Sequence, residues 1–520
     1  MSTLEATVSR ALPVSHYQRM LLAQRGVLLC LVILLSLAAG LVIGVNPRKT
    51  GAVFLAILGL LGGLLLLRRA STGIYILLIG AATFESFGLY FPDSLTDRVP
   101  FFQPLENFGI LVPLSPAEIL MVVTLIIVVL KRIAAREKPL ELGPVFPGVL
   151  FYTVMVVYGF AYGLSTGGDL KDAVWEARVG FYTIFTYLLT FNLIRDVSQM
   201  RRMMWFFIGA EALKGMIGIF RYFVVLQGDA SRVTMLSRSN AMLSHEESIL
   251  FALFFVFLLL LMIFKADRKQ LRLGLLVAPP VMVSFLANQR RAGILALLLD
   301  LFVLALIVYM LLPAMRRPMV RLGVVLVLAM VPYVALFGQS QGMLAQPARA
   351  IASLYKPTER DLGSDMYRVL EGENLKANIR QSPVLGAGYG KPMEQFVSLP
   401  DLTSIFSMWA FVPHNTVLWV WMRLGLLGFV AWWFLMGRSI LQGIMAARSA
   451  TDPYARVVAV LAVAVVVSWV AEGVVDMGLT DFRLTIMVGI FIGLVSRLEV
   501  IAKQKQPEMM RRAASPSVSA

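Results

Sequence analysis

The chain has 520 residues, of which 58% are hydrophobic and only 15% are charged, and its formal net charge is +16. Soluble domains are about half apolar and about a quarter charged, so this composition excludes an ordinary soluble protein. The single cysteine, Cys30, excludes a disulfide framework or a cysteine metal cluster. In a membrane protein the surplus of Lys and Arg does not require nucleic-acid binding, because such residues gather in cytoplasmic loops.

Apolar runs recur from residue 26 to residue 496 and predict membrane-spanning helices. No A-x-A cleavage site follows the first run, so we interpret it as a retained span rather than a signal peptide. The expected spans cover residues 26–45, 51–67, 72–91, 117–131, 146–165, 179–195, 203–227, 247–265, 272–288, 292–312, 320–338, 414–437, 456–475 and 482–496. The expected fold class is all-α, a polytopic transmembrane bundle of about 12–14 spans, and no alternating strand pattern of an outer-membrane barrel appears.

The charges predict the orientation of the bundle. With the N-terminus in the cytoplasm, most Lys and Arg residues fall on the cytoplasmic side, which fits an even number of spans and two cytoplasmic termini. The expected parts are a cytoplasmic segment 1–25, about eleven spans over 26–338, a large outer loop 339–413, further spans over 414–497, and a disordered cytoplasmic tail 498–520.

The outer loop 339–413 contains a predicted amphipathic helix over residues 364–382. Ser364 is a plausible N-cap, and Pro383 ends the helix. The apolar side chains expected near one face are Met366, Leu370 and Ile379. A glycine-rich turn, VLGAGYG (384–390), follows directly.

His414, one of only three histidines, is expected at the outer N-terminus of the span 414–437. Pro413 suits the first position of a helix. The helix dipole disfavours imidazolium there, so we expect a neutral ring that can act as a general base. The alternative is an interfacial histidine that is bonded to a neighbour and has no chemical role.

Two adjacent arginines, Arg290 and Arg291, lie between apolar spans on the outer face, where simple anchoring arginines are not expected. Charge at membrane depth usually faces a cavity or a partner, although both side chains can also snorkel to the interface. Arg368 lies in the predicted loop helix near Glu371, and taken alone it is typical of a surface arginine.

Two further candidates lie on the same face. Arg178 precedes an aromatic-rich span, where it is expected to meet an anionic headgroup or to pair with Glu176 or Asp172. His245, within the run SHEES, is a weaker candidate of the same kind.

Arginines and a neutral histidine on one face suit a phosphorylated lipid. Guanidinium groups match phosphate oxygens in bidentate fashion, and a histidine beside a bound diphosphate can take a proton from an incoming hydroxyl. We therefore expect transfer of a group from a lipid diphosphate. No metal or cofactor is expected, because the histidines are far apart, no carboxylates have ligand spacing, and no nucleotide-binding signature appears.

Four motifs in order resemble the O-antigen ligase and polymerase superfamily. They are RRAGILAL (290–297), YR (367–368), SPVLGAGYG (382–390) and PHNTVLWVWMRLGLLG (413–428). The resemblance covers residues 290–430, whereas the spans before residue 170 match only in hydropathy. It implies a glycosyltransferase of the bacterial inner (cytoplasmic) membrane that works on the periplasmic face, inverting and metal-independent. The implied partners are an undecaprenyl-diphosphate-linked glycan donor, a lipid A core or lipid-linked glycan acceptor, and membrane lipids, with no nucleic acid.

The resemblance also implies roles for residues. His414 is the implied base, and Arg368 with Arg290 or Arg291 contacts the diphosphate. In the mechanism that we expect, Arg178 also helps to hold the diphosphate. The family commonly has Ser-Arg where this chain has Gln-Arg-Arg, and we favour Arg291 because small residues follow it.

The supporting residues of the motifs are Asn415, Gly386 and Gly388. Arg423 stands where an acidic residue is frequent in the family, which leaves its role open.

The motifs leave several functions open. A ligase moves a finished glycan to lipid A core, a polymerase extends a lipid-linked chain, and protein O-oligosaccharyltransferases share the motif set. A transporter or flippase of lipid-linked saccharides is the alternative from another class, although it predicts paired repeats, which the sequence does not show. A non-catalytic membrane scaffold would not explain the ordered motifs.

Overall fold

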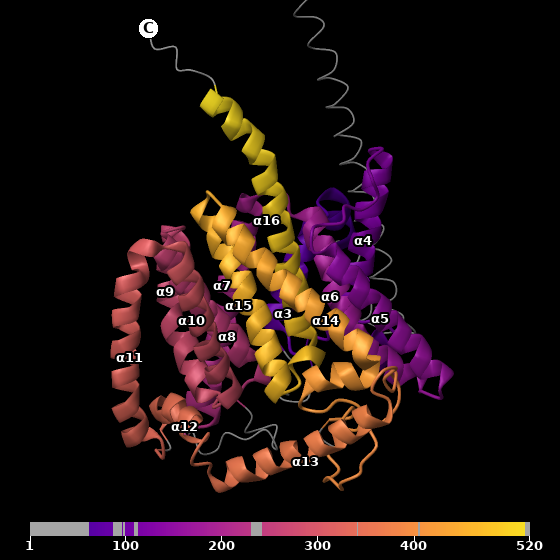
Figure 1. Ribbon diagram of the computed structural model, residues 1–520, viewed down its shortest axis with the longest axis vertical. Coiled ribbons are helices and arrows are strands. Elements are labelled where there is room, and N and C mark those ends of the chain that lie inside the picture. Colours follow the sequence, from indigo (N-terminus) through magenta and orange to yellow (C-terminus); the bar gives the residue numbers. More distant parts are fainter. Residues whose placement is uncertain are drawn as a thin grey trace, which may run out of the picture. The chain divides into compact units, whose positions relative to one another are not determined.

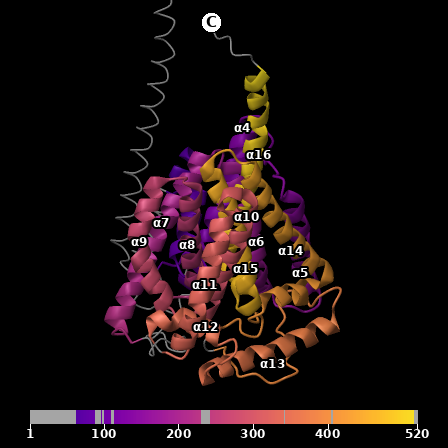
Figure 2. The same cartoon turned by 60° about the vertical axis from the view of Figure 1, so that its left-hand side comes forward.

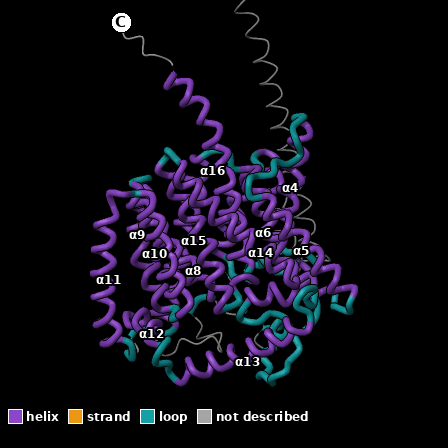
Figure 3. Tube along the Cα trace, viewed as in Figure 1, coloured by secondary structure: helices purple, strands orange, loops and turns teal. Residues whose placement is uncertain are grey.

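A computed structural model of the protein describes residues 62–86, 96, 99–108, 113–229, 242–340, 342–403 and 406–514, without the side chains of 360, 361 and 505–514. These residues form helices and loops, and no strand occurs among them (Figure 3). The all-α fold class is confirmed. Nine of the described helices are long and apolar enough to cross a membrane, so the chain is a multi-pass membrane protein. The predicted span 26–45 and most of 51–67 lie outside the described residues.

Outside the predicted outer loop 339–413, the main helices follow the predicted spans in order (Figure 1). They are α3 (Ser71–Thr83), α4 (Pro116–Ala134), α5 (Phe146–Ser165), α6 (Leu170–Leu193), α7 (Val197–Phe220), α8 (His245–Phe264), α9 (Arg268–Ala287), α10 (Arg291–Leu311), α11 (Arg316–Phe337), α12 (Gln346–Ala352), α13 (Glu359–Gln381), α14 (Thr416–Ser449), α15 (Pro453–Val475) and α16 (Phe482–Ala514).

Capping residues set several helix ends that hydropathy does not mark. Ser115 and Glu118 form a capping box at the start of α4. Asp169 caps α6, so this helix begins nine residues before the predicted start of the span 179–195. The helix therefore extends beyond the predicted span, because the first turns of α6 are polar yet helical.

The bundle has a buried centre and a lipid-facing edge. Within the most apolar stretch of each helix, 78% of residues are buried in α8, 78% in α15 and 83% in α16, but only 6% in α11. An apolar helix with so little buried surface is the one that hydrocarbon is expected to cover. The helices α8, α15 and α16 therefore form the centre of the bundle, and their ends carry polar side chains at fixed positions.

Helix α13 lies across one end of the bundle in both views, away from the C-terminal part of α16 (Figures 1 and 2). It begins at Glu359, so the predicted N-cap Ser364 lies inside the helix and that prediction is wrong. The expected apolar face is also partly wrong, because Met366 is 57% exposed whereas Glu371 and Asn374 are buried. The buried face of α13 is thus largely polar.

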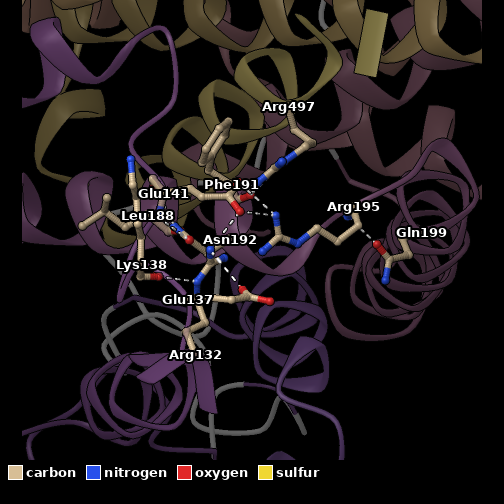
Figure 4. Close-up of polar contacts among 10 residues, drawn as sticks. All are labelled: Arg132, Glu137, Lys138, Glu141, Leu188, Phe191, Asn192, Arg195, Gln199 and Arg497. Atoms are coloured by element: carbon tan, nitrogen blue, oxygen red, sulfur yellow. Dashed lines mark hydrogen bonds and ion pairs between the residues drawn. The ribbon is translucent and has the colours of Figure 1, made fainter. Parts of the chain in front are cut away.

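At the opposite end of the bundle, the carboxylate of Glu141 binds arginines from several segments (Figure 4). Glu141 accepts hydrogen bonds from Arg132 of α4 at 3.0 Å, from Arg195 at 2.9 Å and from Arg497 of α16 at 2.9 Å. Partial burial raises the pKa of Glu141, but these arginines outweigh it and lower the pKa to about 2. The cluster joins α4, the end of α6 and α16, far along the helices from α13.

Candidate active site

His414 lies just before α14 and is held by α13. Glu371 of α13 accepts a hydrogen bond from the backbone N–H of His414 at 2.7 Å, and its Oε2 lies 3.0 Å from Nδ1 of the ring. Asn415 is the N-cap, whose side chain accepts from the N–H of Leu418. The helix therefore begins at Thr416, and the expectation that Pro413 is its first residue is wrong.

The contact with Glu371 sets both the tautomer and the charge of His414. A carboxylate has no proton to donate, so Nδ1 carries the hydrogen and Nε2 is left as the acceptor. Burial lowers the pKa of His414, but the hydrogen bond to Glu371 and the negative charges of Asp476 and Glu371 outweigh burial, and the pKa lies above its ordinary value. The nearby carboxylates thus favour the charged ring, opposite in direction to the effect expected from the helix dipole.

Two aromatic residues fix the plane of the imidazole. The ring of Tyr367 meets the ring of His414 edge-on at a centroid distance of 5.5 Å. The indole N–H of Trp409 donates to the hydroxyl of Tyr367 at 2.6 Å. Burial, together with the charge of Glu371, raises the pKa of Tyr367 to about 12, so this hydroxyl stays neutral.

Asp476, at the end of α15, gathers cationic groups beside His414. Its Oδ2 lies 2.8 Å from Nδ1 of His245 and 3.6 Å from Nη2 of Arg368. Burial raises the pKa of Asp476, but the charges of His245, His414 and Arg368 outweigh it and lower the pKa below the ordinary value. Sequence reasoning missed Asp476, and its only local signal is an acid directly after an apolar span.

The two arginines at the start of α10 have different partners. Arg291 makes a two-pronged contact with Asp365 of α13, at 2.7 and 3.3 Å. Arg290 is the N-cap residue of α10 and, like Arg368, interacts electrostatically with the buried Glu472 of α15. Arg291 thus holds α13 onto α10, and Arg290 joins the charged group around Asp476.

Arg178 forms an ion pair with a carboxylate of α4. Its Nε lies 2.8 Å from Glu118 of α4, and the two side chains are 7% and 11% exposed. The expected pairing with Glu176 or Asp172 is therefore wrong. The Arg178–Glu118 pair borders a mostly apolar cavity of about 230 Å³ between α4, α5 and α6, and the structure does not bring Arg178 to His414.

Arg423, whose role was open, anchors the glycine-rich turn. It is fully buried, its Nε lies 2.6 Å from Glu176, and it donates to the carbonyl oxygens of Gly388 and Phe411. The same Glu176 accepts from the backbone N–H of Gly390 at 2.7 Å. This clamp connects α6 and α14 to the turn and to the segment that leads into His414.

The turn itself requires glycine. Gly386 and Gly388 have φ angles of 76° and 74°, which side chains rarely adopt. A Cβ on Gly388 would lie 2.4 Å from the Cα of Gly163 in α5. The two supporting glycines therefore allow the turn to pack against α5 and against the kink at Gly425 of α14.

Arg423→Met is expected to destabilise the protein by about 3–5 kcal/mol, because it leaves the buried carboxylate of Glu176 without its charge partner. Thermal unfolding in detergent measures this effect. Lys376→Met, at a half-exposed position of α13, is the control and should unfold like the native protein. Equal melting temperatures for Arg423→Met and the native protein would contradict the clamp.

Comparison with known protein families identifies the segment that carries most of this site. Residues 281–433 match the family described as O-antigen ligase. This segment is similar to the O-antigen ligase family. The match confirms the resemblance drawn from the motifs, and it supports transfer of lipid-linked glycans in general. No curated protein matches the chain.

The O-antigen ligase segment contains Arg290, Arg368, Glu371 and His414. Asp476 lies beyond the end of the segment, and His245 lies before its start. The charged group around His414 is thus assembled from the family segment and from parts of the bundle on both sides of it.

Proposed function

We propose that this protein transfers a glycan from undecaprenyl diphosphate to an acceptor hydroxyl on the periplasmic face of the bacterial inner membrane, with both termini in the cytoplasm. The observation that carries the proposal is the His414–Glu371 pair, which leaves Nε2 of an imidazole as a proton acceptor in a group of charges that includes Arg368. The charge surplus of the predicted cytoplasmic loops supports the orientation.

In the proposed reaction, Nε2 of His414 takes the proton of the acceptor hydroxyl. The acceptor oxygen attacks the anomeric carbon on the side opposite to the diphosphate, so the configuration inverts. The anomeric carbon–oxygen bond breaks, and its electron pair leaves with undecaprenyl diphosphate. Glu371 stabilises the imidazolium that forms, as a carboxylate does for a histidine base in general.

The diphosphate is proposed to meet Arg368 and one of the two arginines at the start of α10, Arg290 or Arg291. Guanidinium groups neutralise phosphate oxygens in fixed geometry, which supports a metal-independent reaction. Asp365 engages Arg291 in a bidentate contact, and Arg290 interacts electrostatically with Glu472. Arg178 is left out of the proposed reaction, because Glu118 holds it.

The acceptor separates a polymerase from a ligase, and one experiment distinguishes them. Purified protein is incubated with its lipid-linked repeat unit, first alone and then with lipid A core, and the glycans are resolved by size. A ladder of lipid-linked chains without added acceptor identifies a polymerase, and transfer only to lipid A core identifies a ligase. If the authentic donor gives neither product, glycan transfer is contradicted and transport of lipid-linked saccharides takes its place.

A further inference from the structure

A second imidazole reaches the site through Asp476. His245 is the first residue of α8, and its Nδ1 lies 2.8 Å from Oδ2 of Asp476. The backbone carbonyl of Asp476 accepts from the hydroxyl of Thr416, the first residue of α14, at 3.3 Å. His245 and His414 are therefore attached to the same short region where α14 and α15 meet.

The two histidines have the same local arrangement. In each histidine Nδ1 faces a carboxylate, which is Glu371 for His414 and Asp476 for His245. Nε2 of each ring is therefore the nitrogen that can gain or lose a proton. The side chain of His245 is 31% exposed, whereas that of Asp476 is 9% exposed. A buried carboxylate thus holds an imidazole whose ring still reaches the surface of the site.

The partners of Asp476 place His245 on the side of the proposed diphosphate. Asp476 contacts Arg368 as well as His245, and Arg368 is the arginine that we assign to the diphosphate. A lowered pKa keeps Asp476 ionised beside both cationic partners. Glycan transfer removes one proton from the acceptor and builds negative charge on the leaving diphosphate oxygen, which a positioned acid can neutralise by giving it a proton.

We propose that His245 is the second acid–base residue of this site, which contacts the diphosphate as an imidazolium and gives its Nε2 proton to the departing oxygen. This inference rests on the proposed function. His414 gains the acceptor proton, the acceptor oxygen bonds to the anomeric carbon, and the diphosphate oxygen leaves with the electron pair of the broken bond and takes the proton of His245. Exchange with water then removes a proton from His414 and returns one to His245.

His245→Asn tests the proposal, because an asparagine amide can still donate to Asp476 but has no proton to transfer. With the lipid-linked donor, kcat is expected to fall about 100-fold. The affinity of the purified protein for farnesyl diphosphate, measured by calorimetry, is expected to fall about tenfold, since one charged contact is lost. The melting temperature should stay close to that of the native protein.

His16→Asn, at the remaining histidine of the chain, is the matched control and should behave as the native protein in all three assays. A native kcat in His245→Asn would overturn the role of His245 and leave the proposed function standing. The role of His245 would also be overturned if kcat fell together with the melting temperature, because His245 would then be needed only for folding. A native protein that binds farnesyl diphosphate but transfers no glycan would instead overturn the proposed function, and the proton step with it.

Discussion

His414→Ala is expected to lower the rate of glycan transfer by about 10²- to 10⁴-fold, which is the contribution of a positioned general base. The fold should survive this change. The imidazole is 21% exposed, and the backbone N–H of residue 414 still donates to Glu371 after the side chain is removed. The buried carboxylate therefore keeps one hydrogen-bond partner. Initial rates and the melting temperature in detergent, measured on the same preparation, check the two halves of this prediction.

The matched control is His16→Ala, in the predicted cytoplasmic segment. It should transfer glycan at the native rate. If His414→Ala also keeps a rate within a few-fold of the native protein, His414 is not the base. If the rate of His414→Ala falls only in proportion to the fraction of unfolded protein, His414 has a structural role.

Glu371→Gln is expected to have two effects that a structural role alone would not combine. The rate should fall by about 10²- to 10⁴-fold, because an amide can also donate to Nδ1 and so favour the wrong tautomer of His414. The acidic limb of the rate–pH profile should move to lower pH. Glu371 raises the pKa of His414, and a base must be neutral to act, so removing this negative charge leaves the ring neutral at lower pH.

Glu373→Gln provides the control for this change. It removes a carboxylate from the same helix, but Glu373 is half exposed and pairs with Lys376 rather than with His414. Its profile should match that of the native protein. An acidic limb of Glu371→Gln that stays in place or moves to higher pH would show that Glu371 does not set the protonation of His414.

The helices of the bundle could be predicted from apolar runs, because burial in hydrocarbon requires long apolar segments. The ends could not be predicted as well. Asp169 and Asn415 cap their helices at polar positions, which extends α6 beyond its apolar part and starts α14 after His414. Hydropathy measures transfer into lipid and does not register such hydrogen bonds.

The candidate site was predicted as a list of residues but not as an arrangement. The motifs pointed to His414, Arg368 and the pair at the start of α10, which the structure brings to one end of the bundle. Asp476 pairs with His245 across 231 positions of the chain, and no local pattern marks such a contact. Arg178 was placed wrongly for the same reason, since its partner Glu118 lies on another helix.

The most direct test of glycan transfer at His414 is the release of undecaprenyl diphosphate. Purified protein with a chelator is given the authentic lipid-linked donor and acceptor, and the released lipid and the new glycosidic bonds are counted by mass spectrometry. We predict equal numbers of lipid diphosphates and new bonds in the native protein, and neither product above background in His414→Ala. Equal product formation by the native protein and His414→Ala, or lipid release without bond formation, would contradict the proposed reaction.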